Sequence, residues 1–422
     1  MRKSLDQWLE FQLSTHPLAI AMGLERVREV ARRLQLGRPG KQVITVAGTN
    51  GKGSTVAFIE AIARASGLRV AAFTSPHLLR YNERLRIDGR DVADATLVAA
   101  FEQIEQVRGD TPLTYFEFGT LAALLVFQQA DLDIAILEVG LGGRLDAVNI
   151  IDADVAVITT VDLDHQEYLG GDRETIGAEK AGIFRFGKPC VLAERDPPSS
   201  VLRRAYEVGA VAIRAQADYL TEIHEHGWSW REPGFAVELP MPALPAPAQI
   251  DNAAAAIAAL RALPLKISRK ALVNGVSAAR IPGRLQVIAA GPEVVIDVAH
   301  NPQAAGQLVH WLAAHPKATR AVFSALKDKD IEAIVAQVDP FITRWYLTGI
   351  DDAGQRGLTG GNLAARLAAL VTADRRGVHA SVGEALAAAR ADSAADERVL
   401  VFGSFHTVAG ALKANDPGRD RL

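Results

Sequence analysis

The glycine-rich segment AGTNGKGST, residues 47–55, combines the residue types that bind a phosphate group. Val43, Ile44 and Val46 precede it as a short strand, and residues 52–66 have the apolar spacing of a helix. A strand, a glycine loop and a helix N-terminus direct several backbone N–H groups toward one point, which favours an anion. Lys52 would add a positive charge, and Ser54 or the threonine after it would add a hydroxyl group for Mg²⁺.

Two departures from the usual P-loop pattern leave an alternative open. Val46 stands where the first glycine of that pattern belongs, and Gly53 separates Lys52 from Ser54. A glycine turn without a ligand is therefore the alternative interpretation. The combination of strand, loop, lysine and hydroxyl group favours phosphate binding over it.

Polar residues also follow two other predicted strands in the first half of the chain. Glu138 lies near the end of the apolar run IAILEV, residues 134–139, and Ser75 follows a strand over residues 69–73. In an open α/β sheet, ligands bind beyond the carboxyl ends of the strands. A carboxylate there is costly unless a cation meets it, so Glu138 is a candidate metal ligand. The alternative is a carboxylate held by backbone amides or by Arg144.

His165 and Lys180 are two further candidates. His165 follows a strand over residues 155–159 and two aspartates, although a lone histidine is more often a structural hydrogen-bonding group than a ligand. Periodicity alone places Lys180 on the solvated face of a helix over residues 173–184. Near magnesium ions an ammonium group would be repelled. A neutral amine that takes up carbon dioxide becomes a carbamate, an oxygen anion that a hard cation favours.

The second half of the chain contains a similar cluster, DVAHNP, at residues 297–302. Asp297 ends a predicted strand, where a doubly wound domain presents polar groups to a ligand. Arg284 follows a proline and a glycine that indicate a hinge, so it lies where two domains would close around a nucleotide. The alternatives are that Asp297 caps the helix over residues 303–314 and that Arg284 is an ordinary surface residue.

The elements that position these residues alternate between strands and helices along the chain. This alternation predicts an α/β protein with two doubly wound domains, over residues 1–280 and 281–422. Residues 215–240 are expected to form an antiparallel appendage, and residues 239–249 an extended proline-rich segment. Further helices are expected over 4–36, interrupted at His16-Pro17, 116–130, 252–263, 330–338, 361–371, 383–392 and 406–414, and further strands over 294–297, 321–324, 344–347 and 399–402.

The composition limits the possible partners. Of 422 residues, 49% are apolar and 23% charged, which is typical of a soluble globular protein. The net charge of −3 gives no electrostatic reason to expect nucleic acid or an anionic membrane. Cys190 is the only cysteine, so no internal disulfide can form and a reducing compartment fits. Neither a membrane-spanning apolar run nor a secretory signal is evident, so we expect a cytoplasmic protein.

A set of short segments occurs in order between residues 47 and 409. Together they resemble the bacterial dihydrofolate synthase/folylpolyglutamate synthase family of the Mur ligase superfamily. The segments are AGTNGKGST (47–55), TSPHLLRYNER (74–84), TYFEFGT (114–120), ILEVGLGGRLDAVN (136–149), LDH (163–165), EKAGIF (179–184), DNAAAAIAAL (251–260), PGRLQ (282–286), DVAHNP (297–302), LKDKD (326–330) and GSFHTVA (403–409).

The resemblance implies an N-terminal ATP-binding domain of the Mur ligase central type, a smaller Rossmann-like domain, and ATP-dependent formation of an amide with L-glutamate. ATP phosphorylates a carboxylate of dihydropteroate, or the γ-carboxylate of the last glutamate of a folate. The glutamate amine then attacks the acyl phosphate and releases phosphate. The resemblance also implies two Mg²⁺ ions and leaves a monovalent cation open. We expect small-molecule substrates only and, by resemblance alone, a monomer.

Carried over residue by residue, the resemblance implies four groups of functional residues. ATP would be bound by Thr49, Asn50, Gly51, Lys52, Gly53, Ser54, Asn252, Arg284 and Asp297. The metal ligands would be Ser75 and Glu138 for the first Mg²⁺, with His165 and carbamylated Lys180 for the second. The pterin pocket would be lined by Ala19, Ile20, Ala21, Met22, Thr114, Tyr115, Phe116, Glu117, Leu145 and Asp146. The catalytic groups would be Lys180, His165, Asp297 and His300, with His300 placing the incoming glutamate or the nucleotide.

Two of the pterin residues carry an open question. Ala21 lies two residues before Gly23, at a position where the family often has an aspartate. A polar contact to the pterin would be lost there, so either another group supplies it or the activity on dihydropteroate is altered. Asp146 has an alternative role in a turn after the glycine-rich loop.

Two other functions remain as alternatives. A cell-wall Mur ligase would add an amino acid to a UDP-muramyl peptide, but it usually has an extra N-terminal domain, and only about 40 residues precede the glycine loop here. A nucleotide-dependent switch without ligase chemistry would need the phosphate loop, but it would not need Arg284 and Asp297 facing it.

Overall fold

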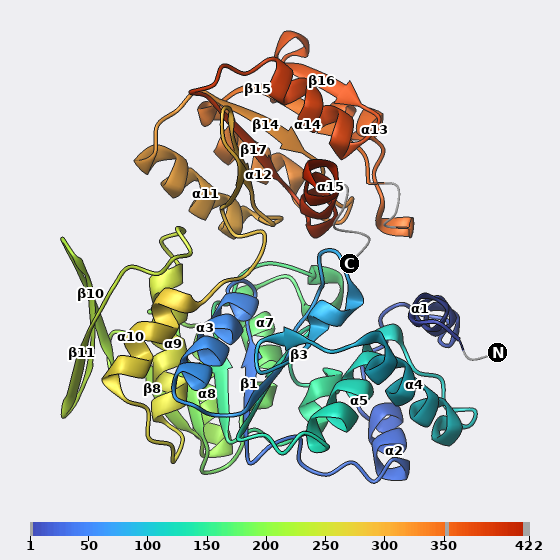
Figure 1. Ribbon diagram of the computed structural model, residues 1–422, viewed down its shortest axis with the longest axis vertical. Coiled ribbons are helices and arrows are strands. Elements are labelled where there is room, and N and C mark those ends of the chain that lie inside the picture. The colour runs from blue at the N-terminus through green and yellow to red at the C-terminus, as the bar shows by residue number, and fades with distance from the viewer. Residues whose placement is uncertain (1–2, 351–353, 417–422) are drawn as a thin grey trace. The chain divides into compact units, whose positions relative to one another are not determined.

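The computed structural model describes residues 3–350 and 354–416, which divide into two compact units (Figure 1). The first contains residues 3–243 and Ile250–Arg280. The second contains Leu244–Gln249 and the described residues from Ile281 onward. Part of the proline-rich segment thus belongs to the second unit, where Ala246 packs against its apolar core.

The first unit is built on an eight-stranded sheet in the described part of the chain, with the order β4-β3-β2-β5-β1-β6-β7-β8. The pairs from β2 to β8 are parallel, whereas β3 and β4 join as antiparallel strands at one edge. The strands are β1 Gln42–Ala47, β2 Val70–Phe73, β3 Leu85–Ile87, β4 Arg90–Asp91, β5 Ile134–Glu138, β6 Val155–Ile158, β7 Pro189–Leu192 and β8 Val211–Arg214.

Helices cover both faces of this sheet because successive strand residues point to opposite faces. Val43 and Ala47 of β1 face the core that α1, α2, α4, α5, α7 and α8 share, whereas α3, α9 and α10 pack on the other face (Figure 1). The helices are α1 Leu5–Ser14, α2 Glu25–Arg33, α3 Lys52–Ala65, α4 Asp94–Arg108, α5 Tyr115–Gln128, α6 Gln166–Leu169, α7 Arg173–Lys180, α8 Ser199–Val208, α9 Gln249–Arg261 and α10 Arg269–Ala278, with short 3₁₀ turns η1 Tyr81–Arg84, η2 Ala147–Ile150 and η3 Ala181–Ile183.

The expected antiparallel appendage is confirmed as a three-stranded sheet of β9 Leu220–His224, β10 Gly227–Glu232 and β11 Phe235–Leu239. Trp228 and Trp230 of its central strand are fully buried, and Trp230 stacks on Tyr219. These aromatic side chains attach the appendage to the first unit without extending the main sheet.

The second unit contains a six-stranded sheet within the described residues, with the order β12-β13-β17-β14-β15-β16. Its strands are parallel except β12, which pairs with β13 in the antiparallel sense. Helices α11, α12 and α13 pack on one face, and α14 and α15 on the other. The elements are β12 Gln286–Ala289, β13 Glu293–Ile296, β14 Thr319–Phe323, β15 Ile342–Thr348, β16 Arg376–His379, β17 Arg398–Phe402, α11 Pro302–Ala314, α12 Ile331–Val338, α13 Gly360–Arg366, α14 Val382–Ala391 and α15 Phe405–Asn415.

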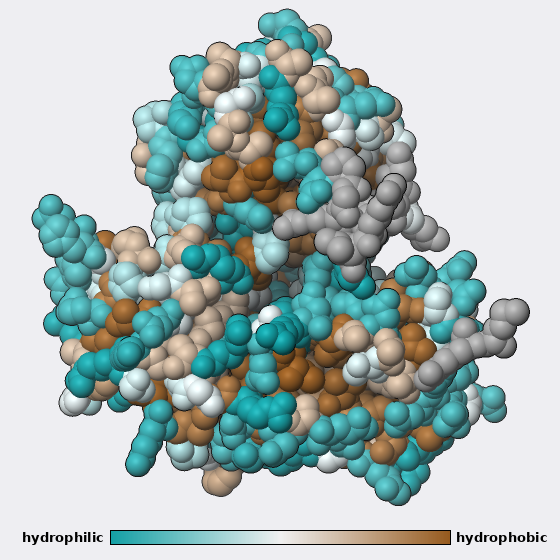
Figure 2. All heavy atoms as spheres, viewed as in Figure 1, coloured by the Kyte–Doolittle hydropathy of each residue, from teal (hydrophilic) through white to brown (hydrophobic). Residues whose placement is uncertain are grey.

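Two doubly wound α/β domains are therefore confirmed as the fold class. Figure 2 shows hydrophilic side chains over much of the visible face of both units, with apolar side chains in smaller areas between them. Among the helices that the structure describes, none has the length and apolar character needed to cross a membrane.

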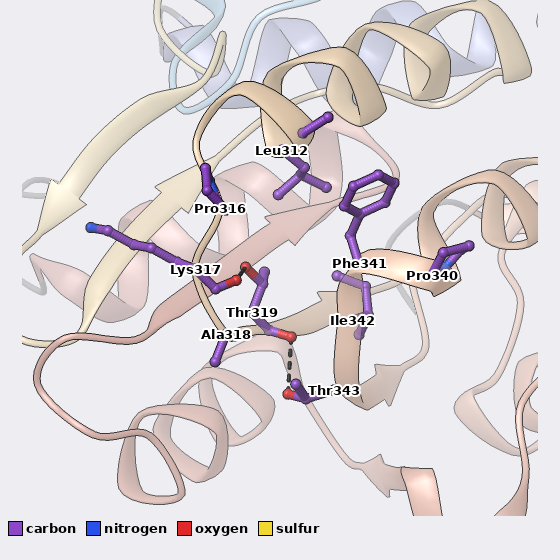
Figure 3. A pocket seen from close by; sticks show the side chains of 10 residues that line it. Leu312, Pro316, Lys317, Ala318, Thr319, Pro340, Phe341, Ile342 and Thr343 are labelled. Atoms are coloured by element: carbon purple, nitrogen blue, oxygen red, sulfur yellow. Dashed lines mark hydrogen bonds between the residues drawn. The ribbon is translucent and has the colours of Figure 1, made fainter.

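A hollow of about 700 Å³ opens where β14 and β15 begin, between Leu312, Phe341 and Ile342 (Figure 3). The hydroxyl group of Thr343 donates to the carbonyl of Thr319 at 3.0 Å at its base. Because ligands of doubly wound sheets bind beyond the carboxyl ends of the strands, this hollow lies at the wrong edge of the sheet for the expected chemistry.

The glycine loop permits a test of the fold in the first unit. A Cβ atom on Gly48, whose φ is +152°, would lie 1.8 Å from the hydroxyl oxygen of Thr159. We expect Gly48→Ala to lower the free energy of unfolding by roughly 2–4 kcal/mol through collision and backbone strain, measured by urea denaturation.

Gly67→Ala is the matched control for this prediction. Gly67 also has a positive φ, +76°, but a Cβ atom there would meet no atom within 4 Å. This variant should lose only about 1 kcal/mol, from strain alone. Equal losses in the two variants would contradict a steric role for Thr159.

Candidate active site

The candidate phosphate loop, residues 48–53, follows β1 and contacts the residues that follow β6. The two strands pair in parallel, so their carboxyl ends lie side by side. The amide of Asn50 donates to the hydroxyl oxygen of Thr160 at 3.1 Å, and the hydroxyl of Thr159 donates to the carbonyl of Asn50 at 2.5 Å. Lys52 turns back over the loop and donates to the carbonyls of Gly48 and Thr49 at 2.9 and 3.1 Å. The loop is thus held in one conformation by side chains on both sides.

Asn252 of α9 packs directly against this loop within the first unit. Its side chain is buried, and its Oδ1 accepts from the hydroxyl of Thr55 at 3.4 Å. A Cβ atom on Gly51 would lie 2.4 Å from the same oxygen, and Gly51 has a φ of +85°. Only glycine fits there, because the space and the left-handed backbone both exclude a side chain.

Glu138 ends β5 and is only 4% exposed. Its Oε2 accepts from the backbone amide of Ser75 at 3.2 Å, which joins the ends of β5 and β2. Of the two alternatives considered for Glu138, the backbone amide is present, but Arg144 is not its partner because it pairs with Glu179 at 2.8 Å. Ser75 and Glu138 therefore lie together, as the sequence predicted.

Lys180 is the last residue of α7 and is 4% exposed, so the interpretation as a solvated helix lysine was wrong. Burial, together with the smaller effect of the Lys52 charge, lowers the pKa of Lys180 to about 7, against the opposing effects of Asp164 and Asp146. About half of such an amine is neutral at pH 7, and the neutral form can act as a nucleophile toward carbon dioxide. The environment therefore suits the carbamate expected from the resemblance.

His165 precedes α6 in the left-handed conformation, with a φ of +50°. Its backbone amide donates to Oδ1 of Asp164 at 2.9 Å, and its Nε2 lies 3.9 Å from the same oxygen. A non-glycine residue in this conformation costs free energy, and such strain gathers at functional sites. This feature supports a functional role for His165, which the sequence could not distinguish from a structural one.

The predicted pterin residues gather around the start of α5. The ring of Phe116 lies against Gly140, where a Cβ atom would be 2.6 Å from it. Thr114 and Glu117 form a capping box at the helix N-terminus. Glu117 also binds Arg26 at 3.0 Å, and Arg26 donates to the carbonyl of Ala21 at 2.8 Å. Arg26 thereby joins the backbone of Ala21 to the start of α5, and Met22 lies near Gly142.

Asp146 has the role in a turn that was considered as its alternative, and its role in the pterin pocket stays a prediction. It is buried and caps η2, and its carboxylate accepts from the amides of Leu141 and Val148 at 2.8 and 3.1 Å. Burial raises the pKa of Asp146 to about 7, against those backbone hydrogen bonds. A carboxyl group that is partly protonated at neutral pH can both donate and accept a hydrogen bond. The neighbouring Leu145 is half-buried.

The second unit presents its own cluster beyond the carboxyl end of β13. The carboxylate of Asp297 accepts from the amides of Leu285 and Ala299 at 2.8 and 2.7 Å. Burial raises the pKa of Asp297, and the charge of nearby Arg284 opposes this. The alternative that Asp297 caps α11 was wrong, because Asn301 is the N-cap and accepts from Ala304.

Arg284 and His300 share one aromatic neighbour in the second unit. The guanidinium group of Arg284 lies 5.5 Å from the ring centroid of Phe405, and the ring of His300 lies 6.2 Å from it. His300 uses Nδ1 toward the carbonyl of Val298 at 2.9 Å, which turns Nε2 away from its own backbone. Arg284, Asp297 and His300 are therefore gathered at one end of the second sheet.

The donor set suits a hard divalent cation. Glu138, Ser75 and a carbamate on Lys180 would supply oxygen atoms, and Mg²⁺ typically keeps water and phosphate oxygens as its other ligands. Within residues 3–350 and 354–416 there is no group of three or more His, Cys, Asp or Glu residues that could hold a metal ion by itself. The residues fit a metal that phosphate oxygens help to hold, rather than a closed protein site.

Sequence reasoning missed two sets of residues that shape the site. Thr159 and Thr160 hold the phosphate loop, and their position directly after the strand over 155–158 could have indicated this. Arg26 joins Ala21 to Glu117, but nothing in its helical context distinguishes it from the other arginines of α2.

Two protein-family models match the chain, one over the candidate residues of the first unit and one over those of the second. Residues 46–260 match the middle domain of Mur ligases, and residues 283–405 match the glutamate ligase domain of Mur ligases. The two matches contain the phosphate loop and the Asp297 cluster, and they define the class as a Mur ligase.

Individual relatives give the narrower assignment. The chain is 45% identical over 418 residues to the dihydrofolate synthase/folylpolyglutamate synthase of Escherichia coli strain K12, covering 98% of this chain and 96% of that protein. The structure of E. coli FolC in complex with DHPP and ADP has a TM-score of 0.93, with 44% identity and 99% of each chain covered. A bifunctional folylpolyglutamate synthase/dihydrofolate synthase with Mn, AMPPNP and L-glutamate bound has a TM-score of 0.91, with 45% identity and 98% of each chain covered. The chain therefore belongs to the dihydrofolate synthase/folylpolyglutamate synthase family, as the resemblance indicated.

The lowered pKa of Lys180 predicts a pH dependence of stability. Because the folded pKa of about 7 lies below the ordinary 10.5, the unfolded chain binds more protons between these values. The free energy of unfolding of the wild type should therefore rise relative to Lys180→Met from pH 7 to pH 10. Urea denaturation in metal-free buffer depleted of carbon dioxide measures this difference.

Lys188→Met is the control, because the Lys188 ammonium group is half-exposed and pairs with Asp154 at 3.0 Å. Its stability difference from the wild type should not change in the same direction over this range. If the free energies of unfolding of Lys180→Met and the wild type changed in parallel with pH, a neutral buried amine would be contradicted.

Proposed function

We propose that this protein catalyses the ATP-dependent addition of L-glutamate to dihydropteroate and to the γ-carboxylate of folylpolyglutamates. The observation that carries the proposal is the grouping of the phosphate loop, Glu138 and buried Lys180 at one edge of the first sheet. The relatives support it, because they are bifunctional synthases by name and one was solved with AMPPNP and L-glutamate.

The reaction follows from the chemistry of a carboxylate, which is a poor acyl donor. A carboxylate oxygen of the folate substrate attacks the γ-phosphorus of ATP, and ADP leaves. The neutral amine of glutamate then attacks the carbonyl carbon of the acyl phosphate, a proton is lost from nitrogen, and phosphate leaves with the C–O electron pair. The task of the enzyme is to position these groups and to neutralise charge on the γ-phosphoryl group.

The first unit would bind the triphosphate and the pterin. In this proposal the amides of Thr49 to Ser54 and the ammonium group of Lys52 receive the phosphates, with Asn252 supporting the loop. Ser75 and Glu138 would hold one Mg²⁺, and His165 with carbamylated Lys180 a second. A bound Mg²⁺ would supply positive charge to the phosphate oxygens. The pterin would lie against Phe116, with Asp146 exchanging hydrogen bonds with its ring.

The second unit supplies three further residues to the proposal. We propose that Arg284 and Asp297 contact ATP and that His300 places the incoming glutamate or the nucleotide. The number of metal ions, a monovalent cation and the monomeric state stay predictions.

The pairing of Arg26 with Ala21 bears on the dihydropteroate activity. Ala21 offers no side-chain hydrogen bond, but the backbone of the pterin loop is fixed to Glu117 through Arg26. We propose that Asp146 and these backbone groups supply the polar contacts, so that both activities are retained.

The proposal is tested by the dependence of ADP release on both co-substrates. Purified protein with ATP and Mg²⁺ should release ADP only when L-glutamate is present together with dihydropteroate or tetrahydrofolate, and the product should contain one more glutamate by mass spectrometry. ADP release that is independent of glutamate would instead support the nucleotide-dependent switch. Turnover of a UDP-muramyl peptide alone would support the cell-wall alternative.

The metal role of Glu138 gives a second test. Glu138→Gln removes the negative charge but keeps the shape, so the Mg²⁺ concentration for half-maximal activity should rise about tenfold or more. Glu60→Gln is the control, because Glu60 is also buried but pairs with Arg86 at 2.9 Å. A normal Mg²⁺ requirement in Glu138→Gln would contradict the assignment.

A further inference from the structure

Arg84 is a buried cation with no acidic partner in the described part of the chain. It ends η1, and only 9% of the residue is exposed. Its guanidinium group lies 5.3 and 5.4 Å from the ring centroids of Tyr81 and Tyr115, and its Nε donates to Nδ1 of His77 at 2.8 Å. His77 accepts this hydrogen bond through a ring nitrogen and supplies no negative charge to Arg84.

The carboxylates near Arg84 in the sequence and in the fold bind other groups. Glu83, its neighbour in η1, accepts from the amides of Leu78, Leu79 and Arg80 at 2.7 to 2.8 Å and so shapes the preceding loop. Glu117 binds Arg26. A guanidinium group removed from water is costly unless an anion meets it, so Arg84 is placed for an anion that the chain itself does not supply.

The position of Arg84 relates this anion to the reaction. Its backbone carbonyl accepts from the amide of Thr74 at 2.9 Å, and the next amide, that of Ser75, donates to Glu138. Tyr115, which lies against the guanidinium group, precedes Phe116 in α5. Arg84 is therefore connected through its backbone to the segment that carries candidate metal ligands, and through Tyr115 to the helix that carries candidate pterin residues.

We propose that Arg84 binds the α-carboxylate of the last glutamate of a folate substrate and so favours folates over dihydropteroate. This inference rests on the proposed function. Dihydropteroate has one carboxylate, which is the one phosphorylated, whereas a folate has a second carboxylate that takes no part in the reaction. A guanidinium group binds such a carboxylate through two parallel N–H donors, and its tyrosine neighbours hold it in place.

The test compares tetrahydrofolate and dihydropteroate as substrates of one variant. A charge-assisted hydrogen bond contributes enough to change affinity by about tenfold or more. Arg84→Gln should therefore raise KM for tetrahydrofolate by about tenfold or more, while KM for dihydropteroate, KM for ATP and kcat with dihydropteroate stay within about twofold. Arg80→Gln is the control, because Arg80 is exposed and pairs with Asp94 at 3.1 Å, and it should leave both KM values unchanged.

A change in the substrate gives an independent test. The α-carboxamide of the same tetrahydrofolate should be a poor acceptor for the wild type, and Arg84→Gln should no longer discriminate against it. Equal increases in KM for both acceptors, or undiminished use of the carboxamide by the wild type, would overturn the proposal. If Arg84→Gln does not fold, the proposal is decided by Arg84→Lys and by the wild-type use of tetrahydrofolate compared with its α-carboxamide. Failure of the wild type to use either acceptor would refute the proposed function instead.

Discussion

The parallel pairing of β1 with β5 and β6 is the constraint on which the candidate site depends. It brings the carboxyl ends of three strands to one edge, and each of them carries a different group: the phosphate loop, Glu138 and the two threonines that hold the loop. A shift of one residue in either register would turn these groups to the other face of the sheet. The apolar side chains of the strands, buried on both faces, fix that register and thereby the chemistry.

The same edge of the first sheet gathers several buried ionisable groups. Burial moves the pKa of Asp146 up and that of Lys180 down, so both groups approach neutrality near pH 7. Glu138 is a buried carboxylate that accepts from the amide of Ser75, and Arg84 is a buried cation that donates to His77. Such groups are costly in a folded protein unless a ligand completes them. Their grouping around one loop distinguishes this edge from the rest of the sheet, including the apolar hollow between Leu312 and Phe341.

Much of the fold could be predicted because the buried strands and the helices have clear periodicity. The helices over 94–108 and 199–208 were missed, the first because its polar residues blur the apolar spacing, whereas the second has an apolar stripe with Val201 and Ala205 that could have indicated it. The sequence placed Glu138 and Ser75 correctly because strand ends are visible in it. It could not show the burial of Lys180 or the left-handed backbone of His165, because both depend on packing between segments distant in the chain.

Lys52 makes hydrogen bonds to the carbonyls of Gly48 and Thr49. The ammonium group thus stabilises the curved form of the loop from within the chain. If the loop binds a polyphosphate as proposed, the Lys52 ammonium group could exchange these neutral carbonyl acceptors for anionic oxygens without refolding of the loop. Binding would then cost little ordering entropy, because the loop is already formed in the folded first unit.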